Sequence, residues 1–247
     1  GRRYGVDADP RRALVTHGAV HAIDSILRAV LAPGDGILIP DPAWPNYEMQ
    51  ARLLGADVAR YPLPASRGYL PDVDELRALI TPRTRAIVLN SPSNPTGAVL
   101  PRELLERIVA LAVEHDLLIV SDEVYDEIVF EGEPVCVADL APDHAASVYS
   151  FSKTYAMTGW RVGYALVPGW LSDPLTRVLE SSVSCLSSVT QAAALEAIGG
   201  DQSAVARMRD AYRERRDLAV GLIEGAGIDL VRPSGAFYLM VPLATGA

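Results

Sequence analysis

The 247-residue sequence has few cysteines, few lysines, no long apolar run and no excess of positive charge. Its two cysteines, Cys136 and Cys185, are too few for a disulfide framework, so a reducing cytoplasm is the expected compartment. Lysine and arginine together number 22 against 31 acidic residues, and the net charge of −9 disfavours a nucleic-acid-binding surface. Because no apolar stretch reaches about 18 residues, we expect no membrane-spanning helix.

Apolar residues make up 49% of the chain and charged residues 21%, which is typical of a folded globular protein. The length suits one large domain, or one domain with part of another. The first residue is not Met, and residues 1–16 resemble the tail of an element already under way. The last residues, 242–247, follow directly on an apolar run. We therefore expect a segment cut from a longer chain at both ends.

Short β-favouring runs alternate with helical periods over the first 170 residues. Strands are expected at 37–39, 58–61, 86–89, 117–120, 148–149 and 164–167. Helices are expected after Thr16 as a cap and on to Val30, and at 45–54, 72–80 and 101–115. Strands alternating with helices predict a mostly parallel sheet in a three-layer α/β/α domain.

The pattern changes near residue 170. Helical segments dominate from Asp173 to Ala226, and Val231 to Val241 is expected to be a strand. We therefore divide the chain into three parts. Residues 1–170 form the core of a large domain, 171–200 complete it with interface helices, and 201–247 contain a connecting helix and the start of a small α+β domain.

Polar residues gather after the expected strands, where open α/β sheets bind their ligands. These residues are Trp44, Asn94, Asp122, Tyr125, Ser150, Ser152, Lys153 and Arg161. The expected helix start at 17–20 adds backbone N–H groups, which form an anion site at a helix N-terminus. The sequence therefore predicts one ligand site built from several strand ends.

These groups together suit pyridoxal 5′-phosphate. The amine of Lys153 can form a Schiff base, and the carboxylate of Asp122 can keep a pyridine nitrogen protonated. The side chains of Asn94 and Tyr125 can hold the ring hydroxyl, and the indole of Trp44 can stack on the ring. The two serines, the arginine and the helix start can hold a phosphate.

Three blocks resemble the signatures of the class I/II aminotransferases, the fold-type I pyridoxal-phosphate enzymes similar to aspartate aminotransferase. The blocks are Asn94-Pro95-Thr96-Gly97, Asp122-Glu123-Val124-Tyr125, and Ser150-Phe151-Ser152-Lys153 through Gly159-Trp160-Arg161-Val162-Gly163-Tyr164. The resemblance covers nearly the whole chain. It implies the fold-type I architecture and a homodimer. It also places the substrate-carboxylate arginine beyond Ala247 and a substrate lid before residue 1.

The resemblance implies a role for each site residue. Lys153 would form the Schiff base and then carry the proton between the substrate Cα and the cofactor C4′. Asp122 would bind the ring nitrogen, while Tyr125 and Asn94 would bind the 3-oxygen. Asn94 would also bind the substrate carboxylate, and Trp44 would stack on the ring beside the substrate. The phosphate would be bound by Ser150, Ser152, Arg161 and the backbone of Gly18, Ala19 and Val20.

We expect a pyridoxal-phosphate-dependent aminotransferase that moves an amino group between an amino acid and a 2-oxo acid in a ping-pong cycle. Two alternatives stay open. The same residues would serve a β-lyase, a decarboxylase or a synthase, because they hold the cofactor without deciding the fate of the carbanion. They would also serve the aminotransferase-like domain of a cofactor-sensing transcriptional regulator. His17 and His21 have a metal-ligand spacing, but no acid completes the motif, so we expect no metal site.

Overall fold

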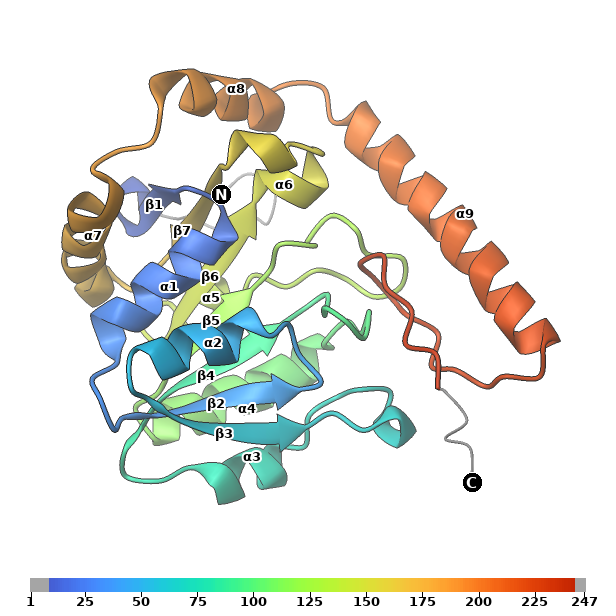
Figure 1. Ribbon diagram of the computed structural model, residues 1–247, viewed down its shortest axis with the longest axis horizontal. Coiled ribbons are helices and arrows are strands. Elements are labelled where there is room, and N and C mark those ends of the chain that lie inside the picture. The colour runs from blue at the N-terminus through green and yellow to red at the C-terminus, as the bar shows by residue number, and fades with distance from the viewer. Residues whose placement is uncertain (1–8, 243–247) are drawn as a thin grey trace.

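The computed structural model describes residues 9–242 (Figure 1). Within this range, seven strands form one sheet in the order β1-β7-β6-β5-β4-β2-β3. Their bounds are β1 Ala13–Thr16, β2 Gly36–Asp41, β3 Asp57–Pro62, β4 Thr84–Asn90, β5 Leu118–Asp122, β6 Ala145–Ser150 and β7 Gly163–Leu166. Strand β7 runs antiparallel to both of its neighbours, and the other pairs are parallel. The mostly parallel sheet is confirmed.

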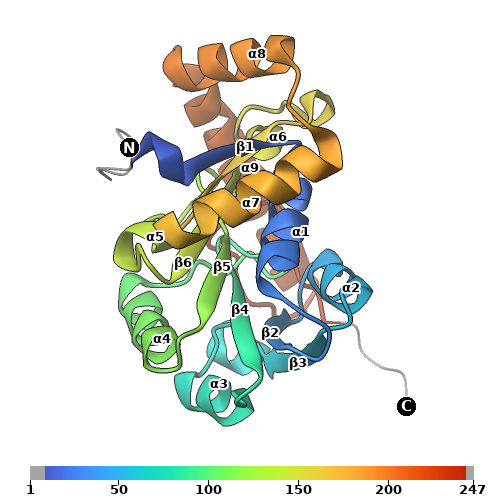
Figure 2. The same ribbon diagram turned by 90° about the vertical axis from the view of Figure 1, so that its left-hand side faces the viewer.

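Helices cover both faces of the sheet. The α-helices are α1 Ala19–Val30, α2 Asn46–Leu53, α3 Val73–Leu79, α4 Arg102–Glu114, α5 Val137–Leu140, α6 Phe151–Thr154, α7 Gly169–Val183, α8 Ser188–Gly199 and α9 Ser203–Gly225, with 3-10 turns η1 Pro10–Arg12, η2 Ala65–Arg67 and η3 Thr158–Trp160. Helices α1, α2 and α7 lie on one face, and α3, α4 and α5 on the other (Figure 2). The three-layer prediction is confirmed.

The central strands are apolar throughout because both of their faces are buried. In β4, Ala86 and Val88 belong to the core under α1, whereas Ile87 and Leu89 belong to the core under α4. A strand turns alternate side chains to opposite faces, so a continuous apolar run supplies both cores. This is why the sequence pattern located these strands.

Local signals also placed several helix ends. The carboxylate of Asp72 accepts hydrogen bonds from the backbone N–H groups of Asp74 and Glu75, at 2.8 and 3.1 Å. It therefore caps α3, as its spacing predicted. Helix α4 begins directly after Pro101. Both starts depend on residues next to each other in the chain, which is why they could be predicted.

The prediction that Thr16 caps the first helix is wrong. Thr16 ends β1 and pairs with Gly163 of β7, and the cap position belongs to Gly18. The Thr16 hydroxyl donates to the carbonyl of Gly18 at 3.1 Å instead of accepting from the first turn. The pairing with β7 holds this backbone extended, and pairing with a strand about 150 residues away leaves no local signal.

The strand predicted at Val231–Val241 is also wrong. In this range the structure records a single isolated bridge, between Val129 and Gly235, and no strand.

Helix α7 begins at Gly169, earlier than the predicted Asp173. Helix α9 leads away from the sheet, and the chain after it returns toward the sheet (Figure 1). The division at residues 170 and 200 stays a prediction. Within residues 9–242, no helix combines the length and apolarity needed to cross a bilayer.

Candidate active site

The sheet brings the predicted site residues to one end of its strands. Strands β2, β4, β5 and β6 are neighbours and parallel, so their carboxyl ends coincide. Strand β7 runs antiparallel to β6, so its first residues lie at the same end of the sheet. Gly163 at that beginning pairs with Ser150 on one side and Thr16 on the other. The loops after β1, β2, β4, β5 and β6 and the loop before β7 therefore converge.

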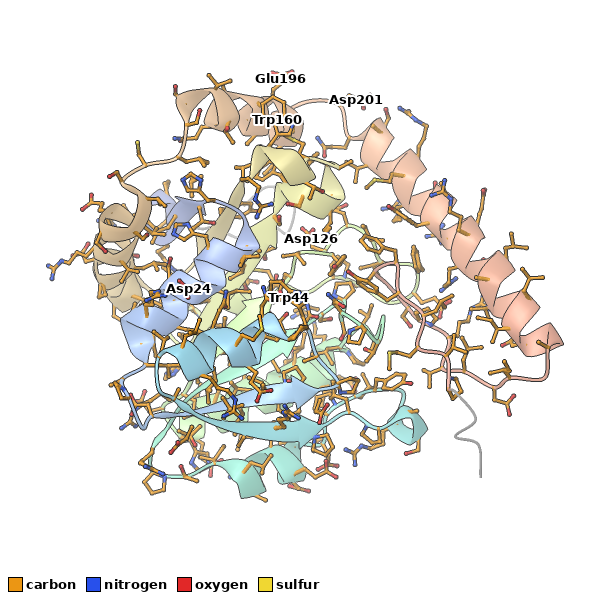
Figure 3. All side chains as sticks on the ribbon, in the orientation of Figure 1. Asp24, Trp44, Asp126, Trp160, Glu196 and Asp201 are labelled. Carbon is orange, nitrogen blue, oxygen red and sulfur yellow. The ribbon has the colours of Figure 1, made fainter. Side chains whose placement is uncertain are left out.

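These loops surround a cavity of about 180 Å³. Its lining consists of Ala19, Val20, Trp44, Tyr47, Asn94, Asp122, Val124, Tyr125, Ser150, Ser152, Lys153, Thr158, Arg161 and Tyr238. Of the predicted site residues, Gly18 alone is absent from this lining. It packs against the guanidinium of Arg161. Trp44 lies near the middle of the molecule, beside α2 (Figure 3). The structure therefore gathers the predicted residues in one place, while their individual roles stay predictions.

Asp122 is the buried acid of the cavity. Its side chain is fully enclosed, with Oδ2 accepting from the Tyr47 hydroxyl at 2.6 Å and Oδ1 from the backbone N–H of Val124 at 3.3 Å. Burial raises the pKa of Asp122 to about 6, and the two hydrogen bonds oppose that rise. A buried carboxylate with two hydrogen-bond donors is still stabilised by a cation placed in the cavity.

Lys153 lies in the one-turn helix that follows β6. The Ser150 hydroxyl oxygen accepts from the backbone N–H of Ser152 at 3.1 Å and so caps this turn. Lys153 is half-buried, and its Nζ lies 5.6 Å from the centre of the Phe237 ring. Lys153 lines the cavity, and its amine lies next to an aromatic ring.

The start of α1 and the guanidinium of Arg161 lie together in an arrangement that could hold an anion, here called the anion cradle. Gly18 has φ +81°, and a Cβ at this position would lie 2.7 Å from Nη2 of Arg161. Glycine therefore lets the guanidinium lie against the helix start. Arg161 is held there by a hydrogen bond from Nη1 to the carbonyl of Thr158 at 2.9 Å. The first N–H groups of α1 point out of the helix end, which favours a phosphate.

The remaining predicted residues are held by neighbouring loops. The backbone N–H of Asn94 donates to Oδ1 of Asn90 at 2.6 Å, and Nδ2 of Asn90 donates to the carbonyl of Asp122 at 2.9 Å. Asn90 thus ties the Asn94 loop to the end of β5. The Trp44 ring meets the Tyr47 ring edge-on at 5.4 Å.

Sequence reasoning missed four lining residues: Tyr47, Val124, Thr158 and Tyr238. Tyr47 follows Trp44 by three residues and lies at the start of α2, so its closeness to the predicted Trp44 could have indicated it. Tyr238 hydrogen-bonds to Tyr125, 113 residues earlier in the chain. No pattern in the sequence could indicate that contact.

The donor set fits pyridoxal phosphate. One amine, one buried carboxylate and one anion cradle surround the same cavity, as a Schiff base, a protonated ring nitrogen and a phosphate require. The cradle is a space that a side chain at position 18 would fill. In residues 9–242, the structure contains no cluster of His, Cys, Asp or Glu suited to a metal ion.

The family model for aminotransferase class I and II matches residues 1–246. The chain belongs to this family. An aspartate/prephenate aminotransferase of Thermus thermophilus is 40% identical over 97% of this chain, and an arginine–pyruvate transaminase of Pseudomonas aeruginosa is 38% identical over 98%. The solved structure of a Thermus thermophilus aspartate aminotransferase double mutant matches with a TM-score of 0.94 and 40% identity, covering 97% of this chain and 64% of that one.

This member of the aminotransferase class I and II family is shorter than the relatives that it matches. It spans 63% of the Thermus thermophilus relative and 62% of the Pseudomonas aeruginosa relative. The family match confirms the predicted resemblance, and the TM-score confirms the fold-type I architecture.

Proposed function

We propose that this chain is the core of a pyridoxal-phosphate-dependent aminotransferase that moves an amino group between an amino acid and a 2-oxo acid. The observation that carries this proposal is the position of Lys153. It is the only lysine among the 247 residues, and it lines the same cavity as Asp122 and the Arg161 cradle. The family match and the names of the relatives support it.

When bound, pyridoxal phosphate supplies the electron sink for a carbanion at the substrate Cα. Lys153 would hold the cofactor covalently and would carry the proton between that Cα and C4′ of the cofactor. Asp122 would keep the ring nitrogen protonated, which would make the sink stronger. Tyr125 would donate to the 3-oxygen, and Asn94 would bind both that oxygen and the substrate carboxylate.

The other residues would orient the cofactor. The Trp44 ring would stack on the pyridine and form a wall beside the substrate. The phosphate would be held by the hydroxyls of Ser150 and Ser152, the guanidinium of Arg161 and the backbone of residues 18–20. The two half-reactions would follow each other in a ping-pong cycle. We further propose that the protein acts in the cytoplasm and as a homodimer.

Reduction with borohydride tests the central assignment. Protein mixed with pyridoxal phosphate and then reduced should carry one pyridoxyl group per chain, on the peptide that contains Lys153. Lys153→Ala removes the only side-chain amine, so it should carry none apart from reaction at the chain's α-amino group. Lys153→Arg is the matched control, because it keeps the charge without a reactive amine. Equal labelling of Lys153→Ala at a defined site would contradict the proposal.

A donor screen separates transamination from the other reactions of this cofactor. An aminotransferase releases a 2-oxo acid and converts an added 2-oxo acid to its amino acid, without free ammonia. A β-lyase would release ammonia, and a decarboxylase would release carbon dioxide. Stoichiometric release of ammonia or carbon dioxide would show that the same site catalyses another reaction, and it would contradict our assignment. A cofactor-sensing regulator would bind the cofactor and turn over no donor.

A further inference from the structure

The chain segment 233–238 is fastened to two loops of the cavity. The backbone N–H groups of Ser234 and Gly235 both donate to the carbonyl of Gly97, each at 2.9 Å. On the other side, the N–H of Ala236 donates to the carbonyl of Ile128 at 2.8 Å. The 233–238 segment therefore bridges the loop that contains Asn94 and the loop that follows Tyr125.

Close packing leaves this segment little freedom. A Cβ at Gly97 would lie 2.3 Å from Cβ of Pro233, and a Cβ at Gly235 would lie 2.9 Å from the carbonyl oxygen of Ile128. Both glycines therefore let the neighbouring chain approach more closely than a side chain at these positions would permit. The residues that follow, Phe237 and Tyr238, are placed by this fixed backbone.

Phe237 and Tyr238 then complete an aromatic cluster around Tyr125. The ring of Phe237 lies 5.3 Å from that of Tyr125 and meets it edge-on, and the ring of Tyr238 does the same at 5.8 Å. The hydroxyl oxygens of Tyr125 and Tyr238 are 2.7 Å apart. Both side chains line the cavity. The two phenols are thus held in hydrogen-bonding contact by packing on both rings.

The direction of this hydrogen bond decides what Tyr125 can do. Each phenol has one proton, so one hydroxyl donates and the other accepts. If Tyr238 donates, the proton of Tyr125 is free to point at an acceptor inside the cavity. Burial raises the pKa of Tyr125 above its usual value, so this phenol keeps its proton near neutral pH. An anionic oxygen in the cavity favours this arrangement, because each bond in such a chain polarises the next.

We propose that Tyr238 is a positioning residue that donates to the Tyr125 hydroxyl and strengthens the hydrogen bond from Tyr125 to the 3-oxygen of the cofactor. The inference rests on the proposed function, since it requires that Lys153 binds pyridoxal phosphate. It adds a residue from the 233–238 segment to a site otherwise built from the ends of the strands. Although Tyr238 also lines the cavity, the role assigned to it here is to act on the cofactor through Tyr125.

A spectroscopic titration without substrate tests this inference. The visible absorption of lysine-bound pyridoxal phosphate changes when the Schiff-base nitrogen loses its proton. A hydrogen-bond donor to the 3-oxygen favours the deprotonated form. Tyr125→Phe removes that donor, so the apparent pKa of the bound cofactor should rise by about one unit. Tyr238→Phe removes only the hydrogen bond that Tyr238 donates to Tyr125 and should raise this pKa by about 0.3 unit. In the double variant, the pKa should equal that of Tyr125→Phe.

Tyr212→Phe is the matched control. The Tyr212 ring stacks on Phe237 at 5.2 Å, so this variant removes a hydroxyl from the same aromatic cluster without altering the pair at Tyr125. Its titration should coincide with that of the unaltered protein. A loaded Tyr238→Phe variant with an unchanged pKa, or shifts that simply add in the double variant, would overturn this inference alone. Unaltered protein that binds no cofactor at Lys153 would overturn the proposed function as well.

Discussion

The hydroxyl of Tyr47 donates to Oδ2 of Asp122 across 2.6 Å, and both side chains are buried at the cavity. Burial raises the pKa of Asp122 to about 6, and the hydrogen bond from Tyr47 works in the opposite direction. Burial also raises the pKa of Tyr47, so the phenol keeps its proton and stays a donor. Tyr47 thus keeps Asp122 ionised in surroundings that favour the neutral acid.

Removing this donor should weaken cofactor binding. In Tyr47→Phe, the pKa of Asp122 should rise, and its carboxylate should hold a protonated ring nitrogen less well. We expect the Kd for pyridoxal phosphate to increase about tenfold, as loss of a hydrogen bond to a charged group predicts. A fluorescence titration measures it. Tyr61→Phe is the control, because that buried phenol donates to the carbonyl of Val88 and not to Asp122. Equal Kd values for the two variants would contradict this role.

A side chain at position 18 should disturb the anion cradle, where we propose that the phosphate binds. Gly18→Ala introduces a Cβ 2.7 Å from Nη2 of Arg161 at a φ of +81°. Gly68→Ala is a matched control, with φ +63° and no atom within 4 Å of the added Cβ. Gly68→Ala should lose about 1–2 kcal/mol of stability, because Gly68 lies in the left-handed α region with ψ 28°. Gly18→Ala should lose about 1–3 kcal/mol, because ψ 170° places Gly18 in a region that other residues rarely occupy. Only Gly18→Ala should also raise the Kd for pyridoxal phosphate, by about tenfold.

The phosphate-free analogue pyridoxal tests whether that loss arises at the cradle. Its Kd should be similar in the unaltered protein and in Gly18→Ala, because it offers no group to the helix start or to Arg161. A parallel loss for both compounds would show that the substitution acts on the whole site and not on the phosphate contacts.

Glu123 should make stability depend on pH. It is buried beside Asp122 in the chain, and its carboxylate accepts from the hydroxyls of Ser147 and Tyr149 and from the N–H of Val137. Burial raises the pKa of Glu123 from 4.5 to about 7. Between these values the unfolded chain has lost this proton while the folded protein retains it. The free energy of unfolding should therefore fall as pH rises from about 4.5 to 7, by about 3 kcal/mol from this group.

Urea unfolding at pH 5 and pH 8 measures the effect. In Glu123→Gln this group no longer titrates, so the fall in unfolding free energy between the two pH values should be smaller than in the unaltered protein. Asp122, whose pKa is also raised, contributes part of the fall in both proteins. Glu133→Gln, at an exposed position, should keep the full fall. A pH dependence in Glu123→Gln equal to that of the unaltered protein would contradict the assignment.

Much of the site could be predicted because its residues follow strands with clear sequence patterns. Asp122 ends β5, whereas Asn94 and Lys153 follow β4 and β6, and the ends of neighbouring parallel strands must lie together. Spacing along the chain was then enough to infer proximity in space. The same reasoning failed at Thr16, where pairing with Gly163 overrides a local capping signal.

The sequence by itself determined which residues lie at the ends of the strands, and hence the amine, the carboxylate and the anion cradle of this member of the aminotransferase class I and II family. Only the tertiary structure decided how these groups are held. Tyr47 reaches Asp122 because α2 packs over the sheet, and Tyr238 reaches Tyr125 because the 233–238 segment is fastened between two loops. Local patterns arise from neighbours in the chain, whereas these contacts join residues 75 and 113 positions apart and arise only from packing.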